Sequence, residues 1–220
     1  MLMLVAFAFV EVKIAKNQLV PLSGFKGEAA LALGVMAAGW GSFGIWLFYL
    51  FRLIESVRGY SALAACAQNA PVVVSGLLAS VAAGFLLSHT KVSYVLLMAT
   101  VSFLIGQILL ATVPAGQTYW AQTFVSNIIM PWGMDMSFPS ATIIVSNSTP
   151  KDDQGMASSL VNTTVNFSIS LSLGIAGTIV RSIDQSGGSQ LSSYRGAWYF
   201  GIELDGMAVL IALYFVIISR

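Results

Sequence analysis

Long apolar stretches separated by short polar segments dominate the hydrophobicity pattern of this chain. Six of the stretches hold about 20 or more mostly apolar residues, the length that a helix needs to cross the hydrocarbon core of a bilayer. They run approximately over residues 30–54, 61–87, 92–113, 119–146, 155–180 and 197–218. The pattern therefore predicts six membrane-spanning helices and an all-α fold.

The segments between the stretches are mostly short, which makes consecutive helices antiparallel neighbours. The exception is the last connection, 181–196, which is longer and rich in Ser and Gly. Residues 30–220 are thus predicted to form a polytopic six-helix transmembrane bundle. Residues 1–10 are apolar but too short to span a bilayer, so we expect 1–29 to be the end of a preceding helix followed by a cytoplasmic linker.

Composition supports an integral membrane protein. The chain is 57% hydrophobic and only 9% charged, whereas soluble domains carry about 25% charged residues. Its net charge of +1 gives no reason to expect a nucleic-acid partner. With one histidine and one cysteine, the sequence lacks paired-histidine haem, zinc-protease, Ser/His and Cys-x-x-Cys chemistry. We therefore expect no cofactor and no enzyme activity, with only an enzyme that works through carboxylates alone left open.

The distribution of lysine suggests an orientation. If segment 11–29 is cytoplasmic, the alternation of helices places all five lysines, at positions 13, 16, 26, 91 and 151, on the cytoplasmic side together with Arg220. Four arginines, at positions 52, 58, 181 and 195, then fall outside. An excess of positive charge inside is the usual arrangement, so we expect a cytoplasmic C-terminus.

An acidic residue interrupts the fourth stretch. Asp135 lies between Pro131 and Pro139, and with Asn127 these residues recur every four positions, along one side of a helix. Prolines free backbone carbonyls that must find other partners. A carboxylate at this depth usually faces a water-filled path or a partner. Asp135 is therefore a candidate for proton or substrate binding, with pairing to a buried donor as the alternative.

Carboxamides occur in two other stretches. Gln68 and Asn69 precede Pro71, where they could bind substrate or satisfy backbone freed by the proline. Asn162 and Asn166 belong to a face of small and polar residues in the fifth stretch. That face could bind substrate or Asp135, or pack against another helix through hydrogen bonds.

Tryptophans and two further acids complete the candidates. Trp40, among small residues, and Trp132, beside Asp135, could form aromatic walls of a ligand cavity. Glu203 and Asp205 are expected near the outer end of the last stretch. There they could line a vestibule or lie in the membrane interface near Arg195.

Two segments resemble a known family. The run 119–139, which includes Met-Pro-Trp-Gly-Met-Asp-Met-Ser-Phe-Pro, and segment 146–162, which includes Pro-Lys-Asp-Asp-Gln-Gly-Met-Ala, resemble transporters of the major facilitator superfamily. The resemblance is to the fourteen-helix drug:proton antiporter branch, in the group of fungal aminotriazole-resistance proteins. Segment 11–22 is similar to the linker that precedes the C-terminal bundle in that family.

The resemblance implies the C-terminal half of a transporter whose substrate lies between two six-helix bundles. The partners are then the absent N-terminal bundle, the lipid bilayer, protons and a small-molecule substrate. The implied function is proton-coupled efflux of small amphipathic compounds across the plasma or vacuolar membrane, with Asp135 exchanging the proton. Expected substrate contacts are Trp40, Gln68, Asn69, Asn127, Trp132, Asn162 and Asn166. The alternative is a truncated, non-transporting membrane protein, or a half-transporter scaffold that needs a partner bundle.

Overall fold

The computed structural model describes residues 27–149 and 154–218, and all long elements in these ranges are helices. They are α2 (Gly27–Arg52), the short π-helix η1 (Leu53–Val57), α3 (Ala62–His89), α4 (Val92–Ala111), α5 (Gln122–Asn147), α6 (Gln154–Gln185) and α7 (Gln190–Ile218). Within these ranges six helices are long and apolar enough to cross a membrane. The predicted six-helix bundle is therefore confirmed, whereas the prediction for residues 1–29 lies outside the described residues except for 27–29, which begin α2.

One predicted boundary is wrong. The expected connection over 181–196 is only four residues long, because α6 extends to Gln185 and α7 begins at Gln190. Tertiary contacts hold these added turns: Ser193 Oγ donates to Asp184 Oδ1, and Arg195 Nη2 donates to the carbonyl of Val113 at 3.0 Å. The change matters for function because it moves Asp205 from near the end of a helix to its middle.

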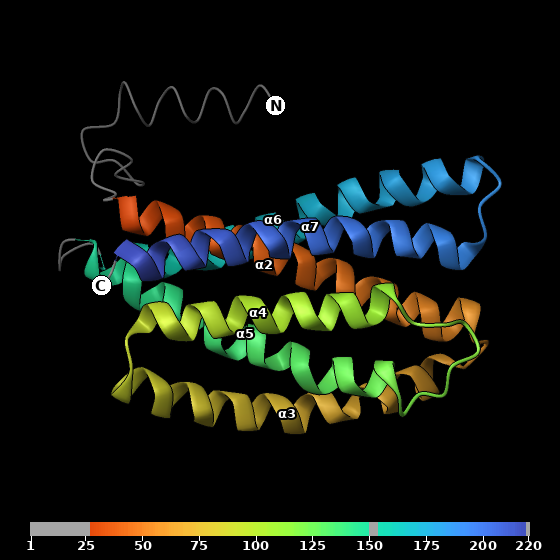
Figure 1. Ribbon diagram of the computed structural model, residues 1–220, viewed down its shortest axis with the longest axis horizontal. Coiled ribbons are helices and arrows are strands. Elements are labelled where there is room, and N and C mark those ends of the chain that lie inside the picture. The colour runs from red at the N-terminus through yellow and green to blue at the C-terminus, as the bar shows by residue number, and fades with distance from the viewer. Residues whose placement is uncertain (1–26, 150–153, 219–220) are drawn as a thin grey trace.

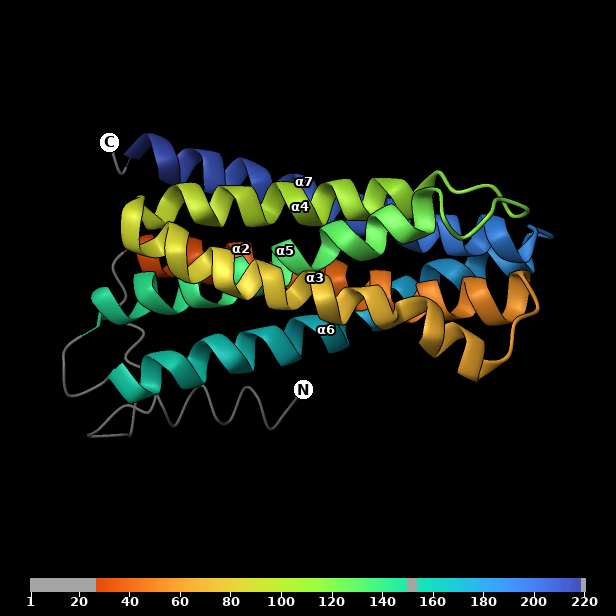
Figure 2. The same cartoon turned by 90° about the horizontal axis from the view of Figure 1, so that it is seen from below.

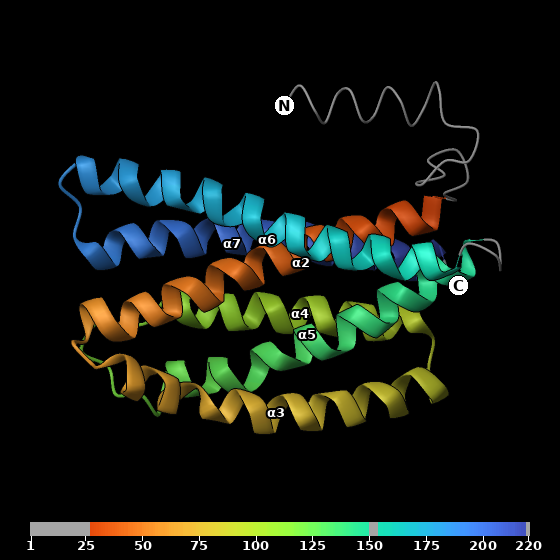
Figure 3. The ribbon, with the colours of Figure 1, turned by 180° about the vertical axis from the view of Figure 1, so that it is seen from behind.

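The helices run back and forth along one axis (Figure 1). The start of α2, the α3–α4 turn and the end of α7 lie at one end of the bundle, and the α2–α3, α4–α5 and α6–α7 connections lie at the other. Helix α2 crosses the middle and packs against α4, α5, α6 and α7. The view from behind shows α3 and α6 as outer helices on opposite sides of α2 and α5 (Figure 3), whereas in the view from below α3 lies in front of α5 (Figure 2).

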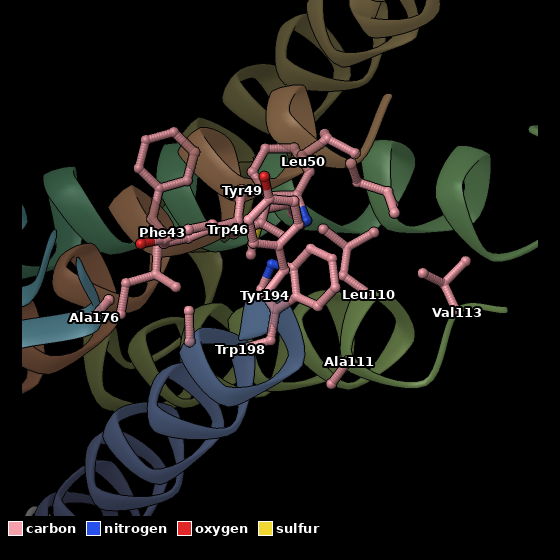
Figure 4. Close-up of a cluster of buried hydrophobic side chains, with 14 of the residues drawn as sticks. Phe43, Trp46, Tyr49, Leu50, Leu110, Ala111, Val113, Ala176, Tyr194 and Trp198 are labelled. Carbon is pink, nitrogen blue, oxygen red and sulfur yellow. The ribbon is translucent and has the colours of Figure 1, made fainter. Parts of the chain in front are cut away.

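An aromatic cluster fills the half of the core nearest the α6–α7 connection. Trp46 and Trp198 are fully buried, and Tyr49 stacks at a tilt on Tyr194 with ring centroids 5.4 Å apart. Figure 4 shows these rings converging from α2 and α7 beside Leu110 of α4. The cluster ties these three helices together at that end of the bundle, and Ala65 of α3 also belongs to it.

Close helix contact depends on glycine at the α4–α5 crossing. A methyl group at Gly133 would lie 2.6 Å from the ring of Phe103, well inside van der Waals contact. Small residues at such crossings let membrane helices approach closely, which is the main source of their attraction. This crossing therefore fixes α5, and with it Asp135, against the rest of the bundle.

Candidate functional site

Helix α3 passes through a proline without ending, and donors on and just before α5 bind a carbonyl in the turn that precedes the proline. Pro71 has no N–H to donate and displaces the turn before it. The carbonyl of Gln68, three residues earlier, accepts from the Asn127 amide at 2.9 Å and from the Tyr119 hydroxyl at 2.5 Å. Burial raises the pKa of Tyr119 above its usual value of 10.0, so this hydroxyl remains a donor at neutral pH.

Pro131 interrupts α5 in the same way, and a side chain of α3 donates to a carbonyl in the turn before it. The carbonyl of Ile128, again three residues before the proline, accepts from the Ser75 hydroxyl at 2.5 Å. The two kinks thus satisfy each other across the α3–α5 contact. The local break in each helix is therefore a defined feature, held by partners on the neighbouring helix.

Asp135 follows these kinks at the centre of α5, thirteen residues after Gln122 and twelve before Asn147. Its carboxylate faces α3, where Ser80 is a hydrogen-bond partner. A methyl group at Gly76 would lie 3.1 Å from Asp135 Oδ2, so the glycine makes room for the carboxylate. Asp135 is only partly buried. The carboxylate is thus held by one neutral donor while part of it remains accessible.

Trp40 reaches the next turn of the same helix from α2. Its indole Nε1 donates to Ser137 Oγ at 3.1 Å, and its ring meets the edge of Phe138 at a centroid distance of 6.4 Å. Phe138 is itself 36% exposed. Trp40 therefore contacts α5 at Ser137 and Phe138, two and three residues after Asp135 along the helix.

Two other predicted contacts have packing roles. Asn127 is fully buried, and its amide is committed to the Gln68 carbonyl. Trp132 packs against a small cluster formed by Ala83 of α3 and Val95 and Ala99 of α4, together with Met136. The structure does not bring these two side chains together with Trp40.

The asparagines of α6 lie on an exposed face. Asn162 and Asn166 are both exposed, and the Asn166 amide donates to the Asn162 carbonyl at 2.9 Å and to its side-chain oxygen at 3.3 Å. Their mutual bonds satisfy part of their hydrogen-bonding capacity within the helix. The rest of that polar face remains open.

Gln68 and Asn69 retain polar atoms without partners. Oε1 of Gln68 and Oδ1 of Asn69 are shielded and accept no hydrogen bond. Gln68 also lines an open pocket of about 630 Å³ between α3 and the start of α5. Apolar and aromatic side chains form most of its wall: Ala67, Ala70, Pro71, Val74, Tyr119, Trp120, Phe124 and Ile128. Tyr119 and Asn127, rather than the side chains of Gln68 and Asn69, donate to the backbone before Pro71, and the role of these two amides in substrate binding stays a prediction.

Asp205 is the residue that sequence reasoning misplaced. It lies fifteen residues into α7, fully buried, and accepts a hydrogen bond from Ser42 Oγ of α2 at 2.7 Å through Oδ2. Its Oδ1 is unpaired. Asp205 lies in the middle of a helix only if α7 starts at Gln190. The Ser/Gly-rich segment before Ala197 is typical of a loop, so the sequence predicts a later start. Among the described residues no group of three or more His, Cys, Asp or Glu side chains could hold a metal ion.

Comparison with known proteins gives the family context for this geometry. The model of the Major Facilitator Superfamily matches residues 4–173. The low affinity ammonium transporter of Saccharomyces cerevisiae is 52% identical over 209 residues, which cover 95% of this chain and 40% of that protein. Efflux pump terJ of Aspergillus terreus is 39% identical with the same coverages. The aminotriazole resistance protein of S. cerevisiae is 37% identical over 95% of this chain and 39% of its own length.

The chain therefore spans about 40% of the length of the curated relatives it matches. A six-helix bundle that aligns with less than half of each relative leaves more than half of those proteins without a counterpart here.

Proposed function

Because the chain belongs to the major facilitator superfamily, we propose that it is the C-terminal bundle of a transporter that exports small amphipathic compounds in exchange for protons. Relatives 39% and 36% identical are named efflux pumps, and one 37% identical is named for resistance to aminotriazole. The family is one of transporters, so the chain falls outside the enzymes. In the superfamily, substrate binds between two bundles near the middle of the membrane.

The exposed faces of α3 and α6 support a second bundle as partner. In the most apolar part of α3 only 17% of the residues are buried inside the bundle, and in that of α6 only 22%. The corresponding share for the first span, which contains α2, is 61%. These two helices flank α2 and α5 on either side (Figure 3). Docking of a partner bundle on both would enclose the side chains that α2 and α5 present between them.

The position and environment of Asp135 are the main support for the proposal. It combines three properties that a proton-exchanging group needs: mid-span depth, partial accessibility and a neutral hydrogen-bond donor, Ser80, as its partner. A carboxyl group with a neutral partner can be charged when water reaches it and neutral when it is covered. A tightly paired carboxylate would lose that freedom.

The remaining predicted residues divide into two roles. We propose Trp40, Gln68, Asn69, Asn162 and Asn166 as substrate contacts, because each has a partly exposed side chain or a polar atom without a partner. Asn127 and Trp132 then position α3, α4 and α5 around the site. We also propose a cytoplasmic C-terminus, in the plasma or vacuolar membrane.

A second candidate function is transport of ammonium. The relative that is 52% identical over 95% of this chain is named for it. A partly exposed carboxylate beside a hydroxyl would suit a small cation as well as a proton.

The experiment is transport in proteoliposomes with an imposed pH gradient. The chain is reconstituted alone, and also co-expressed with the part of the S. cerevisiae low affinity ammonium transporter that has no counterpart in this chain. The substrates are aminotriazole and methylammonium. Proton-coupled efflux predicts aminotriazole flux that requires the gradient and is lost in Asp135→Asn but retained in Cys66→Ala. Flux of methylammonium alone favours the second candidate. Absence of both fluxes from the co-expressed pair would overturn the proposal in favour of a non-transporting scaffold.

A further inference from the structure

A second carboxyl group lies at the middle of the bundle, on the opposite side of α2 from Asp135. Asp205 is fully buried between α7 and α2, and its one hydrogen bond to Ser42 leaves Oδ1 unpaired. An ionised carboxylate without a counter-charge in such a place is very costly. Ionisation of Asp205 would therefore require a positively charged group close to it.

The elements packed against α7 offer no cation at this depth. They are α2, α4, α6 and η1. Helix α4 has no charged residue. The charged side chains of α2, Glu28 and Arg52, are fourteen and ten residues from Ser42, about 21 and 15 Å along the helix at 1.5 Å per residue.

The other charged groups lie at the ends of their helices or outside. On α6, Arg181 and Asp184 are close to the α6–α7 connection, where Asp184 is bound by Ser193. On η1, Glu55 lies at the same end as that connection. On α7, Glu203 is exposed, and Arg195 is ten residues before Asp205 and donates to the Val113 carbonyl. Tyr49 lies on α2, seven residues from Ser42. Tyr94 lies near the start of α4.

Unpaired polar atoms continue from Asp205 toward the α6–α7 end of the bundle. Trp198, Gly201 and Asp205 share one stripe of α7, at i, i+3 and i+7. Gln107 of α4 lies directly against Gly201, and its Nε2 is 3.5 Å from the Trp198 carbonyl. Gln107 Oε1, Trp198 Nε1 and Asp205 Oδ1 are all buried without partners. Buried polar groups without partners need an explanation such as a bound water, and these three lie at the α4–α7 and α2–α7 contacts.

In the other direction along α7 the same stripe is apolar. Ala208 and Ala212 follow Asp205 at i+3 and i+7, fully buried against Ala32, Val35 and Met36 of α2. No polar side chain continues the stripe on α7 beyond Asp205 among the described residues of this helix. Polar groups thus continue from Asp205 toward the α6–α7 end of the bundle only.

We propose that Asp205 is a second proton-binding site, which holds its proton between α2 and α7 and exchanges it only with the α6–α7 end of the bundle, along Gln107 and Trp198. The carboxylic acid is neutral in the packed bundle, hydrogen-bonded to Ser42. The site is independent of Asp135 and of whether the bundle transports, because it rests on the α2–α4–α7 core alone.

Infrared spectroscopy of the chain in lipid nanodiscs tests this directly. A protonated carboxyl gives a carbonyl stretching band that a carboxylate does not. The expected result at neutral pH is a band that disappears in Asp205→Asn and persists in Asp135→Asn. Absence of a band assignable to Asp205 would overturn the proposal.

Two further variants keep the test decisive if Asp205→Asn does not fold. Ser42→Ala removes the one hydrogen bond and should shift the Asp205 band to higher frequency. Gln107→Leu should slow the downshift of that band after transfer to D₂O, because it interrupts the path. A band that Ser42→Ala leaves unmoved, or whose exchange rate Gln107→Leu leaves unchanged, would contradict the site or its access route respectively.

Discussion

The carbonyl of Gln68, at the Pro71 kink, has two donors on the α4–α5 side, and removing them one at a time or together should give a strongly non-additive loss of stability. The variants are Tyr119→Phe, Asn127→Leu and the double variant. Each single change removes one of the two side-chain donors. Interhelical hydrogen bonds in membrane proteins contribute about 0.6 kcal/mol on average, so each single variant should lose roughly that much free energy of unfolding.

The double variant leaves the carbonyl without either donor. A buried polar group with no partner costs about 1–3 kcal/mol. The loss should therefore reach up to about 3 kcal/mol, against about 1.2 kcal/mol for the sum of the two single losses, a coupling of the size found for residues that share one partner.

The assay is reversible unfolding of the purified chain in mixed micelles, followed by helical circular dichroism as the denaturing detergent is increased. Ser140→Ala is the matched control, since that buried hydroxyl donates only within its own helix, to the Met136 carbonyl at 2.6 Å. Strictly additive losses would refute the reasoning, because they would mean that the Gln68 carbonyl has another partner.

The Tyr119 contribution should also depend on pH in a defined direction. Burial raises the pKa of Tyr119 above 10.0, so the folded state favours the neutral phenol. The stability difference between wild type and Tyr119→Phe should be constant below pH 10.0 and shrink above it, as the unfolded phenol ionises first. An increase above that pH would have the wrong sign.

Two further predictions concern packing in the bundle. Gly133→Ala places a methyl group 2.6 Å from Phe103 and should lower the unfolding free energy by about 1–3 kcal/mol, whereas Gly84→Ala, with nothing within 4 Å, should be neutral or stabilising by up to about 1 kcal/mol; equal effects in the unfolding assay would contradict the crossing. Ser126→Ala leaves the buried Trp46 indole, now 2.7 Å from the hydroxyl, without its acceptor, and should cost about 1–2 kcal/mol with a change in tryptophan fluorescence; an unchanged spectrum would count against the bond.

The positions of the spanning helices followed from the sequence because apolar length alone determines them. The first five predicted stretches agree with α2 to α6 at most ends within a few residues. The resemblance to the superfamily, drawn from segments 119–139 and 146–162, is confirmed by the family match over residues 4–173 and by the aminotriazole-resistance relative.

The start of α7 was not predictable in the same way. Residues 186–196 are polar and rich in Ser and Gly, which is typical of a loop. Their helix is held by partners on other elements: Asp184 for Ser193, and the Val113 carbonyl for Arg195. Asp205 was missed for that reason, since its depth depends on where the helix begins.

The candidate site was predictable in its residue types but not in its pairings. Periodicity placed Asn127 and Asp135 on one side of α5, yet the structure commits Asn127 to the Pro71 kink and leaves Asp135 partly open beside Ser80. Which of two polar groups on a shared side pairs with a neighbouring helix depends on the register of that helix, and one sequence does not contain this register.

The central claim, that Asp135 faces water inside the assembled transporter, is tested most directly by cysteine labelling in a Cys66→Ala background. Cysteine replaces Asp135 in one variant and the fully buried Met136 in the other, in the chain co-expressed with its complementary bundle. A membrane-impermeant thiol reagent should label position 135 and leave position 136 unlabelled. Equal protection of both positions, with the reagent applied from either side, would contradict the account.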